Sequence, residues 1–312
     1  MPMIAFVFPG QGSQRAGMGK ALAAAHPVFR EALEQADDVL GEPLSRLCFE
    51  GPAEQLALTE NTQPAVLALS IAAHRLLASR GHAPAMVAGH SLGEYSAHVA
   101  AGTLGFADAL RTVRRRGAYM QEAVPVGEGA MAAVLELETE RVGQACAEAA
   151  VGEVVSVANI NAPGQVVIAG AQGAVARAGK RARELGARRV LPLDVSAPFH
   201  CALMKPAEER LARDLRALVV ADPAVPVVAN VDAEPKRRAA EAVDALIRQV
   251  SAPVQWEAVV RRMAADGVTT FIEIGPGKVL SRLIRQTLPT ARVAQVGDPR
   301  SLEAAQALLA ES

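Results

Sequence analysis

The sequence predicts an α/β protein with a mainly parallel sheet and a smaller subdomain inserted into the chain. Three observations predict this class. Short apolar runs alternate with segments of helical periodicity, the stretch 127–195 has an element order of its own, and a serine between two glycines follows an apolar run at once. Strands that alternate with helices favour a parallel sheet, which binds ligands beyond the carboxyl ends of its strands. We therefore expect the functional residues in the loops that follow the strands.

Composition narrows the class of protein. The chain has 312 residues, of which 51% are hydrophobic, enough for a substantial core. Lys+Arg number 32 against 33 Asp+Glu, a net charge of -1, so no global charge favours nucleic acid or an anionic membrane. The three cysteines lack metal-ligand or C-x-x-C spacing, which predicts free thiols and a cytoplasmic location. No signal peptide is expected, and no apolar stretch reaches the roughly 18 residues of a membrane span.

Residues 4–8 have the pattern of a fully buried strand, and a glycine-rich loop follows at 9–14. The loop fits neither G-x-G-x-x-G nor the Walker A spacing, so no nucleotide site is expected. Because it follows the end of a strand, its backbone N–H at Gln11 is a candidate donor to an oxyanion, and an ordinary glycine turn is the alternative. A helix is then expected near 19–34.

The stretch 53–79 has helical spacing that we expect to be interrupted at 61–64, where Asn61 or Thr62 could cap a helix and Pro64 could occupy its first turn. A strand at 85–88 follows, and then the G-x-S-x-G pattern of Gly89, Ser91 and Gly93.

This pattern predicts a nucleophile elbow, as in α/β-hydrolase-like domains. Its tight strand-to-helix turn needs glycines, because side chains at Gly89 and Gly93 would collide with the strand or the helix. The turn exposes the hydroxyl of Ser91 at the sheet edge, and it places the N–H of Leu92 at the start of a helix, where developing negative charge is favoured. One turn thus supplies a nucleophile and half of an oxyanion hole.

Four arginines lie on the next predicted helix, at 106–121. At about 100° per residue, Arg111 and Arg115 point away from the apolar stripe, whereas Arg114 and Arg116 lie on its two flanks. Helix geometry therefore allows either Arg114 or Arg116 to enter a cleft.

Residues 127–195 read as strands at 130–137, 154–158, 166–169 and 190–195, with helices at 139–149 and 174–185. This βαββαβ order predicts a small ferredoxin-like subdomain, inserted into a large subdomain of residues 1–126 and 196–312. Its second half is basic, which indicates either a solvated helix face or a docking site for an acidic partner. The basic residues are Arg177, Lys180, Arg181, Arg183, Arg188 and Arg189.

Helices are further expected at 204–218, 239–250 and 257–266, and strands at 225–229 and 270–274, followed by a strand-to-helix turn at 275–278. A serine nucleophile needs a base within hydrogen-bond reach. His200 follows a strand and a proline-containing loop, so it is the candidate base. His90 adjoins Ser91, but an elbow directs neighbouring side chains apart. Asp194 and Asp232 are both open as a third member, since neither spacing requires a triad.

Nine short motifs carry a resemblance to a known family. They lie at 8–14, 62–64, 89–94, 116–117, 121–122, 161–165, 196–200, 249–256 and 273–277. In this order, and over nearly the whole chain, they resemble the malonyl-CoA:acyl carrier protein transacylases, the acyltransferases of type II fatty acid synthesis and of polyketide synthases.

The resemblance implies roles for individual residues. Ser91 would be the nucleophile and His200 its base, with the backbone carbonyl of Gln249 in place of the missing acid. The N–H groups of Gln11 and Leu92 would form the oxyanion hole. Arg116, rather than Arg114, would bind the malonyl carboxylate, which a planar guanidinium suits bidentately. The implied substrate pocket contains Gln63, His90, Met120, Asn161 and Phe199.

The resemblance also implies the reaction. The malonyl group of malonyl-CoA would pass through a malonyl-serine to an acidic holo acyl carrier protein, with no bound cofactor and no metal. The carrier would dock on Lys180, Arg181, Arg183, Arg188 and Arg189. The ring of Phe199 would crowd an α-methyl group, which favours malonyl over methylmalonyl. A serine hydrolase or thioesterase is the enzymatic alternative, and a non-catalytic carrier-binding module is the other. Whether the carrier serves fatty acid or polyketide synthesis stays open.

Overall fold

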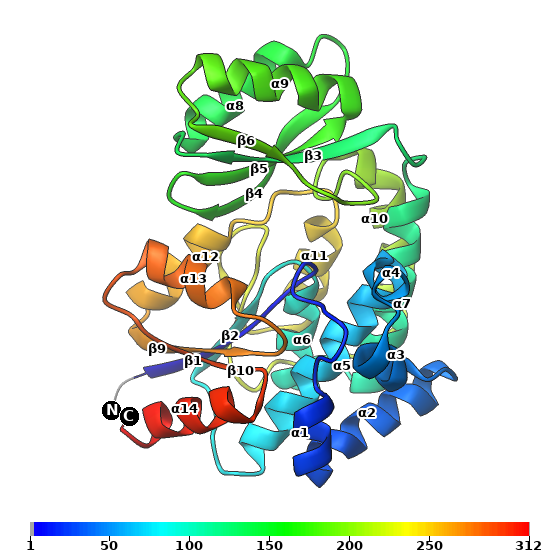
Figure 1. Cartoon of the computed structure of the whole chain (residues 1–312), viewed down its shortest axis with the longest axis vertical. Coiled ribbons are helices and arrows are strands. Elements are labelled where there is room, and N and C mark those ends of the chain that lie inside the picture. Colours follow the sequence, from blue (N-terminus) through cyan, green and yellow to red (C-terminus); the bar gives the residue numbers. More distant parts are fainter. Residues whose placement is uncertain (1–2, 312) are drawn as a thin grey trace.

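The computed structural model describes residues 3–311 and contains two separate sheets (Figure 1). The larger sheet has six strands in the order β10-β9-β1-β2-β7-β8, and its neighbours are parallel except for β7 and β8. The mainly parallel sheet predicted from the alternating elements is therefore confirmed. Its strands are β1 (Met3–Phe8), β2 (Met86–Gly89), β7 (Val227–Val228), β8 (Pro235–Lys236), β9 (Val268–Ile274) and β10 (Arg292–Val296).

The central strand β1 explains why the sheet reads as unbroken apolar runs. Phe6 and Phe8 pack into the core on one face, whereas Ala5 and Val7 belong to the core on the other, and all four are 0% exposed. Helices cover both faces, so neither face needs polar residues. The helices of this part are α1 (Lys20–Ala25), α2 (Pro27–Leu40), α3 (Leu44–Glu50), α4 (Ala53–Ala57), α5 (Thr59–Ala78), α6 (Leu92–Ala100), α7 (Phe106–Glu122), α10 (Lys205–Arg216), α11 (Ala239–Gln249), α12 (Trp256–Ala265), α13 (Val279–Thr287) and α14 (Pro299–Ala310), with a 3-10 turn at Ala202–Met204.

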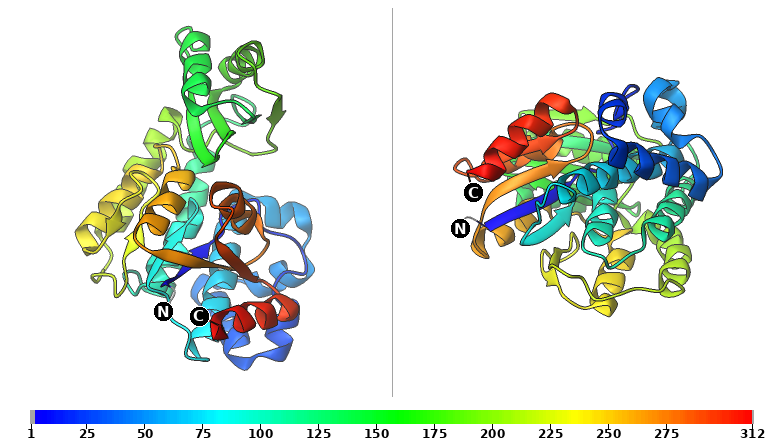
Figure 2. Two further views of the ribbon diagram at one scale, coloured as in Figure 1. Left: turned by 90° about the vertical axis from the view of Figure 1, so that its left-hand side faces the viewer. Right: turned by 90° about the horizontal axis from the view of Figure 1, so that it is seen from below.

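The smaller sheet is antiparallel, in the order β4-β5-β3-β6, and lies at one end of the molecule (Figures 1 and 2). Ala132 and Val134 on β3 pack with α8 and α9, whereas Met131 and Val167 join the core of the larger part. The two helices therefore cover the outer face of this sheet, and its inner face is turned toward the large sheet. The elements are β3 (Gly129–Leu135), α8 (Thr139–Ala149), β4 (Val155–Ala162), β5 (Gln165–Ala171), α9 (Gln172–Glu184) and β6 (Arg189–Pro192).

The breaks between helices differ from the expected ones at two places. The helix expected at 19–34 is divided at His26, between α1 and α2. The interruption expected at 61–64 was wrong: the chain breaks at Leu58, and α5 continues through Pro64. Pro64 removes one helical hydrogen bond, but α5 is buried along most of its length, and tertiary packing outweighs that local loss. The hydroxyl of Thr62 donates to the carbonyl of Leu56 instead of capping a new helix.

No helix within residues 3–311 combines the length and apolarity that crossing a membrane requires. Cys48, Cys146 and Cys201 are buried and unpaired, as predicted from their spacing.

Candidate active site

The elbow is built where two neighbouring parallel strands end. Phe8 of β1 lies opposite Gly89 of β2, and Ser91 follows as the N-cap of α6 with φ 51° and ψ -108°. Non-glycine residues rarely adopt such a conformation, which costs on the order of 1–3 kcal/mol. A Cβ on Gly89 would lie 2.0 Å from the backbone of Gly93, and a Cβ on Gly93 would lie 2.0 Å from the carbonyl oxygen of Phe8. The predicted need for both glycines is confirmed.

Ser91 and His200 form a hydrogen-bonded pair. Ser91 Oγ lies 2.7 Å from His200 Nε2, and His200 Nδ1 lies 2.9 Å from the backbone oxygen of Gln249, the last residue of α11. A carbonyl only accepts hydrogen bonds, so Nδ1 carries the proton and Nε2 is free to accept from Ser91. Neither Asp194 nor Asp232 bonds to His200, and Asp232 is instead paired with Lys236 and Arg248.

His200 is in the protonation state that a base requires. Burial, and secondarily the positive charge of Arg116, lower the pKa of His200 to about 3. Both effects disfavour the imidazolium form. The imidazole is therefore neutral at physiological pH.

Two backbone N–H groups remain open for an oxyanion. Within residues 3–311, neither the N–H of Leu92 nor that of Gln11 has a hydrogen-bond partner. The loop that carries Gln11 passes directly against the elbow, because a Cβ on Gly10 would lie 2.5 Å from the carbonyl oxygen of His90. The side chain of Gln11 is held separately, by its Nε2 donating to Thr59 Oγ1 at 3.1 Å. Both N–H groups belong to residues that line one cavity.

Arg116 is buried at the floor of the same cavity, with 1% of the residue exposed. Its Nη1 donates to Gln63 Oε1 at 2.8 Å, and its Nη2 donates to Gln249 Oε1 at 2.9 Å and to Ser91 Oγ at 3.2 Å. None of the ion pairs within residues 3–311 includes Arg116, and burial lowers its pKa. A buried guanidinium held by neutral groups favours an incoming carboxylate. Arg114, by contrast, pairs with Glu42 and Asn61 away from the cavity.

The cavity, of about 400 Å³, is lined by the elbow and by residues of the small sheet. His90 Nε2 lies 2.8 Å from Asn161 Oδ1 on β4, so the side chain of His90 contacts the small sheet, whereas the base bonded to Ser91 is His200. Phe199, which is 9% exposed, is a further wall. All five expected pocket residues line this cavity: Gln63, His90, Met120, Asn161 and Phe199.

The basic residues expected to dock a partner lie apart from the cavity, and none of them lines it. Arg181 is paired with Glu148 and Glu184, and Arg188 is paired with Glu136. Lys180 and Arg189 belong to no ion pair in the part of the chain that the structure describes. Arg183 donates to the backbone oxygen of Val190.

Asn230 is a site residue that the sequence reasoning missed. Its Oδ1 accepts from the N–H of Ser91 at 2.7 Å, and its Nδ2 donates to the carbonyl of Gly89 at 2.7 Å. It follows β7, the strand beside β2, at the same sheet edge as the elbow. A polar residue directly after an apolar strand is the available signal, but the residues considered as a third member were Asp194 and Asp232, which lies two residues further along.

No group of three or more His, Cys, Asp or Glu side chains within residues 3–311 is arranged to hold a metal ion.

Together these features define a class. A strained elbow serine bonded to a buried neutral histidine, beside two open N–H groups, is the arrangement of enzymes that transfer acyl groups through an acyl-serine.

Comparison with known proteins identifies the family within this class. The sequence model of the acyl transferase domain matches residues 5–303. The chain is 50% identical over 306 residues to the malonyl CoA-acyl carrier protein transacylase of Escherichia coli, covering 98% of this chain and 99% of that protein. It is 48% identical over 312 residues to the Bacillus subtilis protein of the same name, covering 100% and 98%.

Solved structures agree. An acyl carrier protein S-malonyltransferase from Vibrio cholerae superimposes with a TM-score of 0.95 at 50% identity, over 97% of this chain and 99% of that one. A malonyl-transacylase solved in complex with its type II polyketide synthase acyl-carrier protein has a TM-score of 0.95 at 48% identity, over 97% and 98%. The chain belongs to the malonyl CoA-acyl carrier protein transacylases of the acyl transferase family.

Proposed function

We propose that this protein moves the malonyl group of malonyl-CoA to the phosphopantetheine thiol of an acyl carrier protein, through a malonyl ester on Ser91. One observation carries the proposal. The hydroxyl of Ser91 lies 2.7 Å from His200 Nε2 and 3.2 Å from Arg116 Nη2, so a base and a cation meet at one nucleophile. The substrate is malonyl-CoA, and the reaction uses no bound cofactor.

In the first half-reaction, Ser91 Oγ attacks the thioester carbonyl while its proton passes to His200 Nε2. The N–H groups of Gln11 and Leu92 stabilise the oxyanion, and the carbonyl of Gln249 accepts from the Nδ1–H of the imidazolium. The C–S bond then breaks, and His200 returns the proton to the CoA sulfur. CoA leaves, and the malonyl group stays on Ser91.

In the second half-reaction, the pantetheine thiol gives its proton to His200 Nε2, and the sulfur attacks the malonyl ester. The intermediate collapses with breakage of the C–O bond, and Ser91 Oγ takes the proton back. The free enzyme is regenerated.

Arg116 gives the site its preference for malonyl groups. Acetyl-CoA lacks the distal carboxylate and leaves the buried guanidinium without an anionic partner, whereas malonyl-CoA supplies one. Phe199 on the cavity wall adds a second preference, because its ring would crowd the α-methyl group of methylmalonyl-CoA.

The experiment is intact-mass and peptide mapping after mixing with malonyl-CoA, using Ser91→Ala as the control. We expect a malonyl adduct on the peptide that contains Ser91 and none in the variant. Holo acyl carrier protein is then added. Malonyl-carrier as the main product supports the transferase, whereas free malonate as the main product supports the hydrolase or thioesterase alternative. Absence of any adduct supports the non-catalytic carrier-binding module.

Three further inferences concern the subdomains of the chain, its location in the cell and the surface on which the carrier docks. We infer that residues 127–195 form a ferredoxin-like subdomain inserted into a hydrolase-like one of residues 1–126 and 196–312, which the strand order β4-β5-β3-β6 supports. We infer a cytoplasmic location from the free cysteines. We also infer that an acidic carrier docks on the basic run, chiefly at Arg188 and Arg189, because β6 leads from there into cavity residues 193–196.

A further inference from the structure

A buried carboxylate, Glu94, lies one turn after the nucleophile and has no part in the reaction steps above. The residue is 0% exposed. Its Oε2 accepts two hydrogen bonds, from Gln249 Nε2 at 2.7 Å and from the N–H of Asn230 at 3.1 Å. Its Oε1 has no hydrogen-bond partner among the described residues. A buried carboxylate is costly unless it is well paired, so its presence beside the elbow needs a reason.

The two groups that Glu94 binds both hold the backbone of Ser91. Gln249 Nε2 donates to the carbonyl of Ser91 at 2.9 Å, and Asn230 Oδ1 accepts from the N–H of Ser91 at 2.7 Å. Ser91 has the strained φ of 51° and does not keep it without such support. Glu94 therefore fixes the two contacts that constrain the nucleophile.

Gln249 also links Glu94 to the rest of the site. Its Oε1 accepts from Arg116 Nη2 at 2.9 Å, and its backbone oxygen accepts from His200 Nδ1 at 2.9 Å. A shift of this one residue would move the nucleophile, the base and the guanidinium relative to one another. The amide of Gln249 has both of its ends occupied, and Glu94 is one of its anchors.

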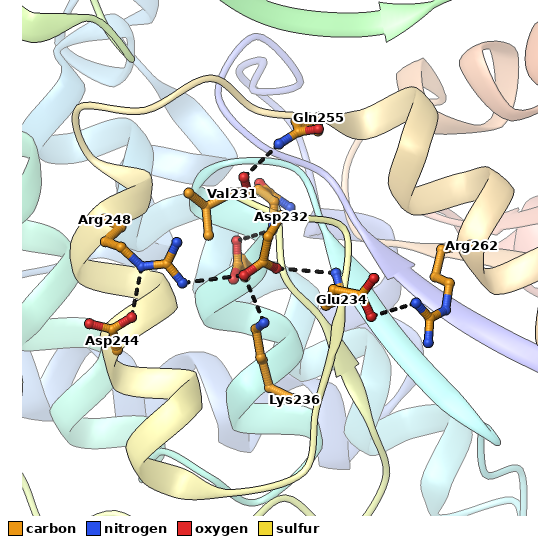
Figure 3. A network of polar contacts seen from close by, with 10 residues as sticks. Val231, Asp232, Glu234, Lys236, Asp244, Arg248, Gln255 and Arg262 are labelled. Carbon is orange, nitrogen blue, oxygen red and sulfur yellow. Dashed lines mark hydrogen bonds and ion pairs between the residues drawn. The ribbon is translucent and has the colours of Figure 1, made fainter.

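An ion-pair network centred on Asp232 lies beside Asn230 and Gln249 in the chain, since Asp232 is two residues after Asn230 and Arg248 directly precedes Gln249 (Figure 3). Asp232 accepts from Lys236 Nζ at 2.8 Å and from Arg248 Nη2 at 3.2 Å, which ties the loop after β7 to the end of α11. Gln255 adds a bond from its N–H to the carbonyl of Asn230 at 2.9 Å. The loop after β7 and the end of α11 are thus joined to each other by ion pairs. Glu94 on α6 joins both of them to the elbow.

We propose that Glu94 is a positioning residue, whose carboxylate holds Gln249 and Asn230 and thereby sets Ser91 and Arg116 for malonyl transfer. The role requires a hydrogen-bond acceptor at the place of Oε2. Glutamine at this position presents such an acceptor without the charge. Aspartate keeps the charge but withdraws the acceptor by about 1.5 Å.

The test compares Glu94→Asp, Glu94→Gln and Glu94→Ala in single-turnover acylation of Ser91 by malonyl-CoA and by acetyl-CoA, followed by mass spectrometry. We expect Glu94→Asp and Glu94→Ala to lower the malonyl rate about 100-fold and to narrow the malonyl-to-acetyl ratio about tenfold, because Arg116 loses its alignment. Glu94→Gln should stay within about tenfold of the wild-type rate and keep the ratio. If Glu94→Ala does not fold, the comparison of aspartate with glutamine decides.

Glu273→Asp is the matched control. Glu273 is also 0% exposed, and its carboxylate accepts from the N–H groups of Leu280 and Ser281 at the start of α13. We expect this variant to lower the melting temperature and to keep the malonyl-to-acetyl ratio. The proposal is overturned if Glu273→Asp narrows the ratio as much as Glu94→Asp does. It is also overturned if Glu94→Gln is as impaired as Glu94→Asp, or if Glu94→Asp slows both substrates by one common factor.

Discussion

The guanidinium of Arg116 donates a hydrogen bond from Nη2 to the hydroxyl of Ser91 at 3.2 Å. The group proposed to bind the substrate's carboxylate therefore touches the atom that attacks its thioester. In the mechanism that we propose, the carbonyl of the malonyl group would lie at Ser91 and its carboxylate would lie against Arg116. In that mechanism the contact would couple recognition of the carboxylate to attack on the thioester.

Arg116→Ala should slow the reaction with malonyl-CoA far more than the reaction with acetyl-CoA. Charge-assisted hydrogen bonds to a buried partner contribute about 1.5–3 kcal/mol, so we expect kcat/KM for malonyl-CoA to fall about 100-fold while that for acetyl-CoA changes less than tenfold. The measurement is the initial rate of CoA release with each substrate. Arg114→Ala is the matched control, because Arg114 lies two residues away but pairs with Glu42 and Asn61. An unchanged malonyl-to-acetyl ratio in Arg116→Ala would contradict the carboxylate role.

Acylation should resist acid. Because the pKa of His200 is lowered to about 3, the base stays neutral as the pH falls through 6.5, the ordinary pKa of imidazole. We expect kcat/KM for malonyl-CoA to change less than about twofold between pH 8 and pH 5.5, where an unperturbed imidazole would lose about tenfold. Stopped-flow CoA release in this range, with circular dichroism to verify folding, measures it.

A second titrating group, Glu94, is linked to His200 through Gln249, and its effect on the pH profile must be distinguished from that of His200. Burial raises the pKa of Glu94 to about 7, so the same pH profile is recorded for Glu94→Gln. A limb near pH 7 that disappears in this variant belongs to Glu94. A limb near pH 6.5 that is present in both proteins would show that His200 titrates normally and would refute the prediction.

Features of the site that lie within a few residues of one another could be predicted from the sequence. The elbow lies within five residues, so the steric rule for Gly89 and Gly93 predicted Ser91 directly. His200 could be chosen among the histidines as the candidate base, because loops that follow parallel strands meet at one edge of the sheet. The roles of these residues stay predictions, but the geometry places them together as expected.

Other parts of the site depend on contacts between distant segments. Asn230 reaches Ser91 from 139 residues away, and the amide of Gln249 reaches it from 158 residues away. No local spacing indicates such a pair, since both depend on how the loop after β7 packs against α11. The start of α5 at Thr59 was missed for a related reason, because burial of the helix overrides the local signal of Pro64.

His98 should make the protein acid-sensitive in stability. It is fully buried on α6, and neither of its ring nitrogens has a partner among the described residues. Burial lowers its pKa to about 3, so between pH 3 and 6.5 the unfolded chain binds the proton and the folded chain does not. Stability from this group is complete above pH 6.5 and falls as the pH is lowered below it.

His98→Leu removes this linkage. At pH 5.5 the wild type should lose about 1.4 kcal/mol of unfolding free energy through His98 relative to pH 8, and the variant should not. Urea denaturation of both proteins at both pH values measures the difference between them, which should grow in favour of the variant by that amount on acidification. A difference that is the same at both pH values would mean that His98 binds the proton equally in the folded and the unfolded chain, which would contradict the prediction.

Charge reversal at the proposed carrier dock should affect one half-reaction only. Arg188 and Arg189 are exposed, and they lie where β6 begins to lead toward the cavity. Exposed charges at the rim of an interface act mainly on association rate, and salt screens them. We expect Arg188→Glu with Arg189→Glu to lower kcat/KM for holo acyl carrier protein about tenfold at low ionic strength and much less in 0.5 M salt. Malonylation of Ser91 by malonyl-CoA should keep its rate.

Arg177→Glu is the matched control, because Arg177 lies on α9, pairs with Glu153, and is further along the outer face of the small sheet. Equal loss of both half-reactions would indicate a folding defect, and equal effects of the two variants would place the dock elsewhere.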